Sequence, residues 1–307
     1  MTGNVDRKSL AVVHLVVREL GIDFFREFIS SYREFDAGVD HVLILALKQF
    51  GCDEDFLPYQ TELAGIAYEV VHVPDFGHDI GSYVSIAKQT DFQRYCFINS
   101  KTELNADKWL KMLTDEQDKH PHGIAGSTGS WQSLASDALK YGPHKRPAVV
   151  MNVRRVLGYL WLRRKFPKFP NPHIRTNVFV VSRDIFLSLN FGNIGSKDDT
   201  WKLESGQSSI SRQIKARGGE LLVVDSQGRS YRPESWAGSG TFWQDSQQGL
   251  LAKDRQTRIY EQAKQTERSA MTAEAWEKPA LPNARETLIF ALSAIAAAIL
   301  VLLFMAT

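Results

Sequence analysis

Three short polar clusters of this chain carry side chains suited to bind a phosphate, hold a cation or accept a proton. Asp79 lies in the first, the second runs from Asn99 to Glu103, and the third covers residues 197–219. A carboxylate can take a proton from a reacting hydroxyl group or ligate a divalent cation. A lysine such as Lys101 can neutralise a diphosphate as a point charge. Together these side chains favour a site for a phosphate-bearing ligand.

Each cluster also has a purely structural interpretation, and the sequence leaves both interpretations open. Asp79 fits the N-cap of the helix that follows it. The polar run at 99–103 fits a turn that closes a strand, because Asn and Ser side chains bond to nearby backbone groups. Glu204, at the start of a helix predicted over 205–219, fits a residue that complements the helix dipole. Asp199 fits a solvated turn.

Common nucleotide, metal and hydrolase motifs are missing from the sequence. Neither GxGxxG after the first predicted strand nor GxxxxGK[ST] occurs, and the GxxGxxG at 123–129 has the wrong spacing. No GxSxG elbow, HExxH pair or cysteine cluster is present. These absences argue against a dinucleotide-dependent dehydrogenase, a P-loop NTPase, an α/β-hydrolase and a zinc protein.

The elements that must position the polar clusters are predicted to alternate between strand and helix. Apolar, Val-rich runs predict buried strands, and amphipathic segments after them predict helices. The first four predicted strands lie at 10–17, 41–50, 66–74 and 96–99. This alternation indicates an α/β fold with a mostly parallel, doubly wound central sheet flanked by helices. The three polar clusters then fall at strand ends on one side of the sheet.

Composition and charge are those of an ordinary globular protein. The 307 residues include 43% hydrophobic residues, two cysteines and a formal net charge of +2. A near-neutral chain without a recognised motif gives no indication of a nucleic-acid partner, so none is expected. Two isolated cysteines indicate reduced thiols in a cytosolic compartment rather than a disulfide framework.

The C-terminal stretch at 287–307 contains no charged side chain. A helix of about 20 apolar residues is long enough to cross a bilayer. We therefore expect one transmembrane helix at 287–307, a polar linker at 266–286 and a globular domain at 1–265. The N-terminus has no apolar signal region, and basic residues precede the predicted span. The domain is thus expected to be cytoplasmic in a single-pass membrane protein.

The order of these features resembles that of glycosyltransferases with the GT-A fold, in the broad family-2-like and rhamnan-synthesis-like bacterial group. The resemblance spans residues 8–230 and includes TNVFVVSRDIF followed by Glu204, Arg212 and Gly218. It implies a Rossmann-like GT-A domain in which a nucleotide sugar lies across the first strands. In this group a polar motif, often DxD, ends the fourth strand, and an acidic residue precedes an Arg and a Gly.

The resemblance assigns roles to individual side chains. Glu204 is expected to act as the general base, with Asp199 as the second choice. Glu103 is expected to ligate a metal ion. The nucleotide sugar is expected to be held by Asp79, Asn99, Ser100, Lys101 and Arg212.

The chain departs from the group's pattern at the end of the fourth strand. Where Asp-x-Asp would ligate a divalent cation, this chain has Asn99-Ser100-Lys101. Asn and Ser oxygens bring no negative charge to Mn²⁺ or Mg²⁺, and Lys101 could itself neutralise the diphosphate. The sequence leaves two possibilities open: a Mn²⁺ or Mg²⁺ cofactor bound through Glu103, or a site that uses Lys101 without a cation.

The resemblance and the apolar tail together imply a membrane-tethered glycosyltransferase. It would move a hexosyl or deoxyhexosyl group from a nucleotide-sugar donor to a saccharide or lipid-linked acceptor, in surface polysaccharide synthesis. A tether beside the bilayer would raise the effective concentration of a lipid-borne acceptor. The alternative is a non-catalytic membrane scaffold with a glycosyltransferase-like fold, which the missing DxD favours.

Overall fold

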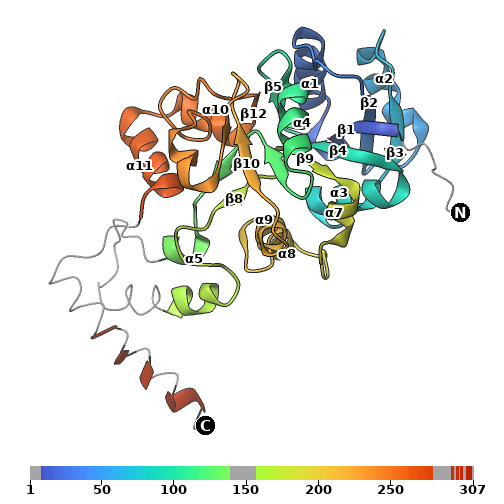
Figure 1. The fold of residues 1–307 in the computed structure, drawn as a ribbon. Helices are drawn as coiled ribbons and strands as arrows, with labels where there is room; N and C mark the ends of the chain where they lie inside the picture. Colours follow the sequence, from blue (N-terminus) through green and yellow to red (C-terminus); the bar gives the residue numbers. More distant parts are fainter. Residues whose placement is uncertain are drawn as a thin grey trace, which may run out of the picture.

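An eight-stranded central sheet organises the computed structural model (Figure 1), which describes residues 8–138, 157–278 and short pieces of 292–305. In spatial order its strands are β11 (Ser230–Tyr231), β10 (Leu221–Val224), β6 (Ile124–Gly126), β9 (Val178–Ser182), β4 (Phe92–Ile98), β1 (Lys8–Val17), β2 (Val42–Lys48) and β3 (Glu69–His72).

The direction of the strands confirms a mostly parallel sheet. β1 pairs in parallel with β2 and β4, β2 with β3, and β6 with β10. Two strands depart from this rule: β9 runs antiparallel between β4 and β6, and β11 runs antiparallel to β10. The carboxyl ends of β1 to β4 therefore meet at one edge, and the segment that enters β9 reaches the same edge.

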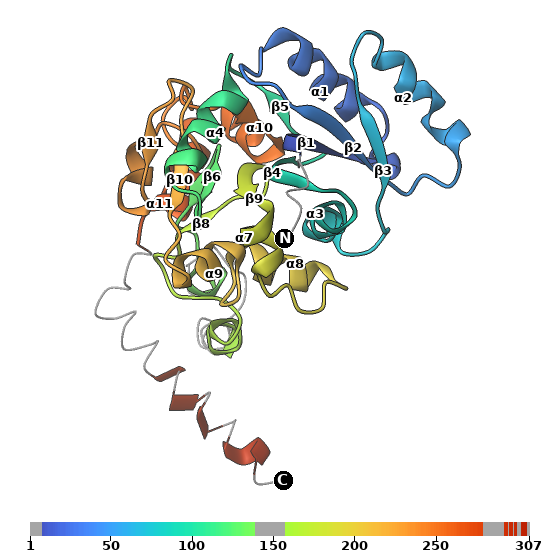
Figure 2. The same cartoon turned by 45° about the vertical axis from the view of Figure 1, so that its right-hand side comes forward.

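Helices cover both faces of the sheet, as Figure 2 shows. One layer packs on the face to which Val12 and Val16 of β1 point, and the other on the face of Val13 and Leu15. The first layer comprises α1 (Asp23–Glu34), α2 (Leu57–Glu62) and α4 (Trp109–Lys119). The second comprises α3 (His78–Gln89), α7 (Arg183–Ser188), α8 (Lys197–Ser205) and α9 (Ile210–Ala216). Burial on both faces explains the continuous apolar run of β1.

Smaller elements complete the described chain. Two short antiparallel pairs are β5 (Glu103–Leu104) with β12 (Ala252–Lys253), and β7 (Gly129–Ser130) with β8 (His173–Ile174). Further elements are the helices α5 (Leu134–Asp137), α10 (Arg255–Gln262) and α11 (Gln265–Trp276), and the 3₁₀ turns η1 (Arg18–Leu20), η2 (Asp53–Phe56) and η3 (Pro233–Gly238). Residues 157–163 are also helical.

The first part of the segment predicted as a linker, 266–286, is a packed helix instead. α11 covers Gln265–Trp276, and the Trp276 indole Nε1 donates a 2.7 Å hydrogen bond to the Phe242 carbonyl. The Trp131 amide donates to the Ala275 carbonyl at 3.0 Å. The polar composition that suggested a linker is that of a surface helix with one buried end. The packed unit therefore continues beyond residue 265 to Trp276.

The predicted transmembrane helix at 287–307 lies mostly outside the described residues. Across the described part of the chain, we find no helix with the length and apolar character that a membrane span requires.

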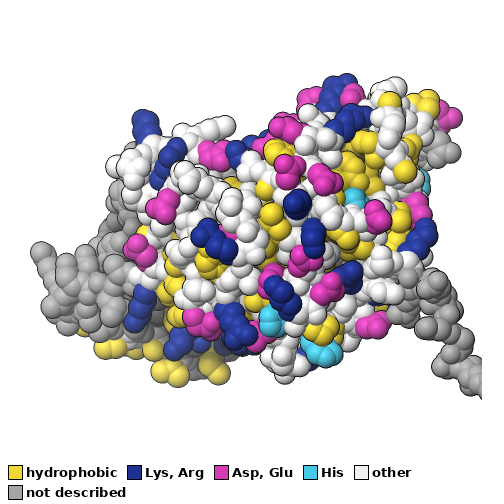
Figure 3. All heavy atoms as spheres, turned by 45° about the horizontal axis from the view of Figure 1, so that its top comes forward, with side chains coloured by type: hydrophobic (Ala, Val, Ile, Leu, Met, Phe, Trp, Pro, Cys, Tyr) yellow, Lys and Arg dark blue, Asp and Glu magenta, His cyan; other side chains and the backbone are white. Residues whose placement is uncertain are grey.

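Charges of both signs are mixed over the face shown in Figure 3, where Lys and Arg side chains alternate with Asp and Glu. No continuous basic area is visible on this face.

Candidate active site

A cavity of about 630 Å³ opens at the edge where the carboxyl ends of β1, β2 and β4 meet. In open α/β sheets ligands bind at this edge, just outside the strand ends. The cavity is lined by Leu15, Val17, Glu19, Leu20, Lys48, Gln49, Asp75, Phe76, Gly77, His78, Asp79, Asn99, Ser100, Lys101, Gly195, Lys197, Thr200, Trp201 and Glu204. The structure thus brings five of the eight side chains predicted for the site to one cavity, from three distant segments of the chain.

One interpretation of the sequence placed Asp79 at the N-cap of the helix that follows it. In the structure Asp79 lies in the first turn of α3 instead. Gly77 is the N-cap residue, with a left-handed φ of 78°, and a Cβ there would lie 3.0 Å from the Gly81 Cα. Because only glycine adopts this conformation without strain, α3 starts one residue earlier than Asp79. Asp79 Oδ1 accepts a hydrogen bond from the Ile80 amide at 2.9 Å within this first turn, and the side chain also borders the cavity.

A buried threonine joins Asp79 to Glu204. The Thr176 hydroxyl Oγ1 lies 3.2 Å from Asp79 Oδ2 and 3.3 Å from Glu204 Oε1. The Thr176 amide also donates to Glu204 Oε1 at 3.4 Å, and Asn99 Nδ2 donates to Asp79 Oδ2 at 3.3 Å. These contacts connect the start of α3, the end of β4, the segment before β9 and the end of α8. Thr176 therefore orients both carboxylates toward the cavity.

The two carboxylates are electrostatically coupled. Burial raises the pKa of Asp79, and the negative charge of Glu204 raises it further. A single threonine hydroxyl proton can serve one of the two carboxylates at a time.

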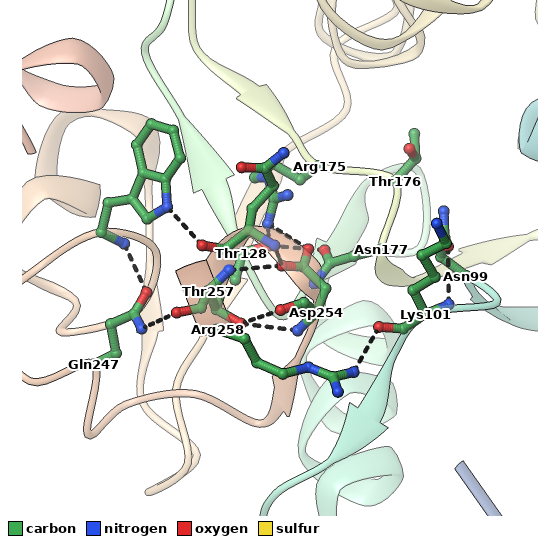
Figure 4. Close-up of polar contacts among 12 residues, drawn as sticks. Asn99, Lys101, Thr128, Arg175, Thr176, Asn177, Gln247, Asp254, Thr257 and Arg258 are labelled. Carbon is green, nitrogen blue, oxygen red and sulfur yellow. Dashed lines mark hydrogen bonds and ion pairs between the residues drawn. The ribbon is translucent and has the colours of Figure 1, made fainter. Parts of the chain in front are cut away.

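The polar run after β4 forms a tight turn around Asn99. Asn99 Oδ1 accepts hydrogen bonds from the Lys101 amide at 3.2 Å and from the Ser100 hydroxyl at 3.3 Å. The turn thereby has the structural role that the sequence allowed, and it also borders the cavity. The Lys101 ammonium lies 5.2 Å from the centre of the Phe24 ring. The Lys101 backbone carbonyl accepts a hydrogen bond from Arg258 Nη2 at 3.1 Å (Figure 4).

Lys48 is a cavity residue that the sequence analysis missed. It ends β2, is buried, and its ammonium donates to the Phe76 carbonyl at 3.0 Å and the His78 carbonyl at 2.9 Å. Burial lowers the pKa of Lys48, and the nearby carboxylates Asp79 and Asp75 oppose this effect. The signal was present in the sequence, because Lys48 is the first polar residue after an apolar strand, as Asn99 is after β4.

Glu103, the predicted metal ligand, is not among the cavity residues. It lies in β5, opposite Lys253 of β12, and its carboxylate is 3.9 Å from Arg258 Nε. No group of three or more His, Cys, Asp or Glu side chains suited to a metal ion occurs within residues 8–138 and 157–278. The donor set of the described cavity does not fit a cation held by protein ligands alone. A cation carried in with a diphosphate stays a prediction.

Glu204 ends a helix instead of opening one. α8 starts at Lys197 and Glu204 is its penultimate residue, while Arg212 belongs to the separate helix α9. Gly206 and the Ser209 N-cap separate the two helices, because their backbone is extended. Trp201 lies one turn before Glu204 and so shares its face of α8. Trp201 and Glu204 border both this cavity and a second cavity, which is described below.

Asp199 has a structural role at the start of α8. Its Oδ2 accepts hydrogen bonds from the Ser196 amide at 3.1 Å and the Ser196 hydroxyl at 2.7 Å, which completes a capping box. The Ser196 hydroxyl, together with Lys202, lowers the pKa of Asp199 to about 2. A carboxylate with so low a pKa is a poor base near neutral pH. Asp199 also lies outside the residues that line the cavity.

Arg212 points away from the site. It is exposed on α9, its Nε donates to the Gln207 carbonyl at 3.3 Å, and it is not among the residues that line the cavity. Gly218, the glycine of the predicted pattern, follows the end of α9 with a φ of 80°, which is the usual role of glycine at a helix end. The structure therefore brings Glu204 but not Arg212 to the cavity.

A second cavity of about 370 Å³ adjoins the first and shares Trp201 and Glu204 with it. Its other lining residues are Ser130, Gln132, Leu134, His173, Arg175, Ser205, Phe242, Trp243, Gln256 and Glu274. Most of these belong to segments far from the first cavity in the sequence. Glu204 thus faces two adjoining spaces, as a residue that acts between two substrates would.

No protein-family model matches the chain, and no curated protein matches it in sequence. Solved structures to which it is similar include S. aureus TarS in complex with UDP-GlcNAc, with 12% identity, a TM-score of 0.31, and coverage of 45% of this chain and 36% of TarS. Another is glucosyl-3-phosphoglycerate synthase from Mycobacterium tuberculosis with Mn²⁺, UDP and glucosyl-3-phosphoglycerate, with 15% identity, a TM-score of 0.38 and 64% coverage of both chains. A third is GalNAc-T7 with UDP, GalNAc and Mn²⁺, with 16% identity, a TM-score of 0.44, and coverage of 75% of this chain and 44% of GalNAc-T7.

The chain thus spans less than two thirds of the length of each of these three proteins. Similarity this divergent and partial does not establish what the chain does, since one fold serves many activities.

Proposed function

We propose that this chain transfers a glycosyl group from a nucleotide-sugar donor to an acceptor hydroxyl. The observation that carries the proposal is the convergence of Asp79, Asn99, Lys101 and Glu204 on one cavity at the carboxyl ends of the strands. The resemblance to GT-A glycosyltransferases assigns roles to the same four residues. Polar side chains from three separate segments that meet at this edge are typical of a ligand site in an α/β fold.

The walls of the first cavity suit a nucleotide diphosphate. Lys48, Lys101 and Lys197 line it and can act as point charges toward phosphate oxygens. Val17 and Leu20 supply an apolar wall at the end of β1. With about 630 Å³, the cavity lies within the range of small-molecule sites.

Glu204 can supply the proton transfer that the reaction needs. In a direct displacement, the acceptor oxygen forms a bond to the anomeric carbon while the bond from that carbon to the diphosphate oxygen breaks. The acceptor's proton passes to the Glu204 carboxylate, and the electron pair of the broken bond leaves with the diphosphate. Positive charge beside the leaving diphosphate, from Lys101 above all, stabilises the transition state.

The proposal is tested by a screen of UDP-, GDP- and dTDP-sugars for thermal stabilisation of the full chain in detergent. A ligand at 100 times its dissociation constant should add about 2.7 kcal/mol to the free energy of unfolding. Arg212→Ala is the matched control, because its side chain lies outside both cavities. Absence of stabilisation by every nucleotide sugar would refute the proposal. Stabilisation without transfer to any acceptor would favour the non-catalytic scaffold.

Thr176 is expected to support turnover by orienting Glu204. Thr176→Val removes the hydroxyl that lies 3.3 Å from Glu204 Oε1 and should lower kcat about tenfold, since a hydrogen bond to a charged group is lost. Thr176→Ser keeps the hydroxyl and should restore most of kcat, with donor affinity unchanged in both variants. Steady-state kinetics with saturating donor measure the effect. Equal rates for the valine and serine variants would show that the hydroxyl has no such role.

Binding of the nucleotide-sugar diphosphate is expected to depend on Lys101 more than on Glu103. Lys101→Ala should weaken nucleotide-sugar binding about tenfold or more, equally with Mn²⁺ and with a chelator, because a charged contact is lost. Glu103→Gln should leave binding nearly unchanged, since Glu103 faces Arg258 and not the cavity. Calorimetric titration measures both. A loss of Mn²⁺-dependent binding in Glu103→Gln would instead support the predicted cation site.

The sequence of 287–307 supports a membrane tether, and we include it in the proposal. With the chain anchored at the cytoplasmic face, the acceptor would be a saccharide or a lipid-linked saccharide in surface polysaccharide synthesis. We expect the full chain to require detergent for extraction, whereas a chain that ends at Lys278 should stay in the salt-washed soluble fraction. That shorter chain retains α11. Recovery of the full chain in the soluble fraction would rule the tether out.

A further inference from the structure

The second cavity has walls that differ from those of the first. Its residues come from β7, β8, the end of α8, α10, α11 and the segment around Trp243. At about 370 Å³ it is large enough for a small ligand, and it shares Glu204 with the first cavity. A group bound there could present a hydroxyl to Glu204 while a nucleotide sugar occupies the first cavity.

Aromatic rings and amide side chains dominate this second cavity. Trp201 is 44% exposed, although it is a large hydrophobic side chain, and it borders both cavities. The Phe242 and Trp243 rings stack with centres 4.4 Å apart, and Trp243 Nε1 donates to the Gln256 carbonyl at 3.1 Å. Indole faces pack against the C–H faces of sugar rings, and an amide such as that of Gln256 bonds to hydroxyl groups.

The positive charge in this cavity is already neutralised. Arg175 is the one Arg or Lys among the described residues that line it. Its guanidinium is 2.8 Å from Asp254 Oδ2 and lies over the Phe242 ring at 4.0 Å, and Figure 4 shows it directed at the Asp254 carboxylate. Both side chains of this ion pair are almost fully buried. The charge and the N–H donors of the Arg175 guanidinium are therefore directed at the Asp254 carboxylate instead of at a ligand.

The titratable groups of the cavity add no positive charge. Burial lowers the pKa of His173 to about 4, and its Nδ1 lies 2.8 Å from the Asn171 carbonyl, so its ring is neutral near pH 7. Glu204 contributes a negative charge on the side shared with the first cavity. A phosphate or carboxylate placed beside Glu204 would be repelled, whereas a hydroxyl-rich, uncharged ring would not.

We propose that the second cavity binds the acceptor and selects an uncharged saccharide, whose hydroxyl meets Glu204 between Trp201 and the donor. This inference rests on the proposed function and names the acceptor class for the same site. A phosphate of a lipid-linked acceptor would then lie outside the cavity, and the terminal sugar inside it. The acceptor saccharide must therefore carry an uncharged sugar at its non-reducing end.

The test uses the full chain in detergent on an array of immobilised glycans with neutral, uronate-bearing and phosphorylated terminal residues. Neutral termini should bind, and charged termini should bind at least tenfold more weakly. Trp201→Ala should weaken neutral-glycan binding about tenfold, because a stacking face is lost. Gln256→Ala should weaken it severalfold, because a hydrogen bond is lost. Trp161→Ala is the matched control, since Trp161 is also exposed, also has a lysine over its ring, and lines neither cavity.

Preference for phosphorylated or uronate termini, or neutral-glycan binding that neither Trp201→Ala nor Gln256→Ala weakens, would overturn the inference. The same preparations are tested for stabilisation by nucleotide sugars, which Gln256→Ala should leave unchanged. Donor binding without neutral-glycan binding would refute the acceptor assignment alone. Absence of donor binding would refute the proposed function itself.

Discussion

Replacing Glu204 with glutamine is expected to lower the rate of glycosyl transfer by about 10²–10⁴-fold, the usual contribution of a general base. Glutamine keeps the size of the side chain and can still accept a hydrogen bond from Thr176, but it cannot take the acceptor's proton. Donor affinity should change little, because the proton is taken on the acceptor side. Single-turnover kinetics at saturating donor separate the chemical step from binding.

Asp199→Asn is the matched control for that experiment. Asp199 lies five residues earlier on the same helix, but its carboxylate is used to cap α8. Its replacement should leave the transfer rate near that of the unsubstituted chain, at a small cost in stability. Thermal unfolding of both variants shows whether a rate loss reflects misfolding. A folded Glu204→Gln protein with an unchanged rate would contradict the assignment of Glu204 as the base.

Replacing Asp254 with alanine is expected to lower the free energy of unfolding by about 3–5 kcal/mol, as for the loss of one partner of a buried ion pair. The substitution would leave the Arg175 guanidinium buried without its carboxylate at 2.8 Å. It would also remove the N-cap of α10, because Asp254 Oδ1 accepts from the Gln256 and Thr257 amides at 2.9 Å each. Thermal or chemical unfolding of the full chain measures the loss.

Two controls separate the causes of that loss. Asp254→Asn keeps a good N-cap and removes the charge, so its effect isolates the ion pair. Asp118→Ala breaks an exposed ion pair with Arg94, which should cost no more than about 1 kcal/mol. If Asp254→Ala costs as little as Asp118→Ala, the Arg175–Asp254 pair does not hold the wall of the second cavity, and Arg175 becomes available to an anionic acceptor.

Several features of the fold could be predicted because they depend on neighbouring residues. The apolar run of β1 indicated a strand buried on both faces, and the spacing of apolar residues indicated α1, since side-chain periodicity is a local property. The alternation of strand and helix then indicated a mostly parallel sheet. Parallel strands end at one edge, so placing Asp79 and the turn at Asn99 near one another required no further information.

Other features depended on contacts between distant segments. The sequence could not show that β9 runs antiparallel between β4 and β6, because strand direction follows from how the chain returns to the sheet. The sequence also could not show that α11 packs against the segment around Phe242, because the polar composition of α11 is also typical of a linker. The position of Lys48 at a strand end can be seen in the sequence, but its contacts with the Phe76 and His78 carbonyls depend on how the start of α3 packs beside β2.

The residues of the candidate site show the same distinction between local sequence and tertiary contacts. The sequence by itself determined which residue types stand at the strand ends, and so proposed Asp79, Asn99, Ser100, Lys101 and Glu204. Tertiary structure alone decided that Arg212 faces away, that Glu103 pairs with Arg258, and that Asp199 caps α8. It also decided that Glu204 borders two cavities. The physical reason is that residue type sets what a side chain can bond to, whereas packing of distant segments sets which partner lies within reach.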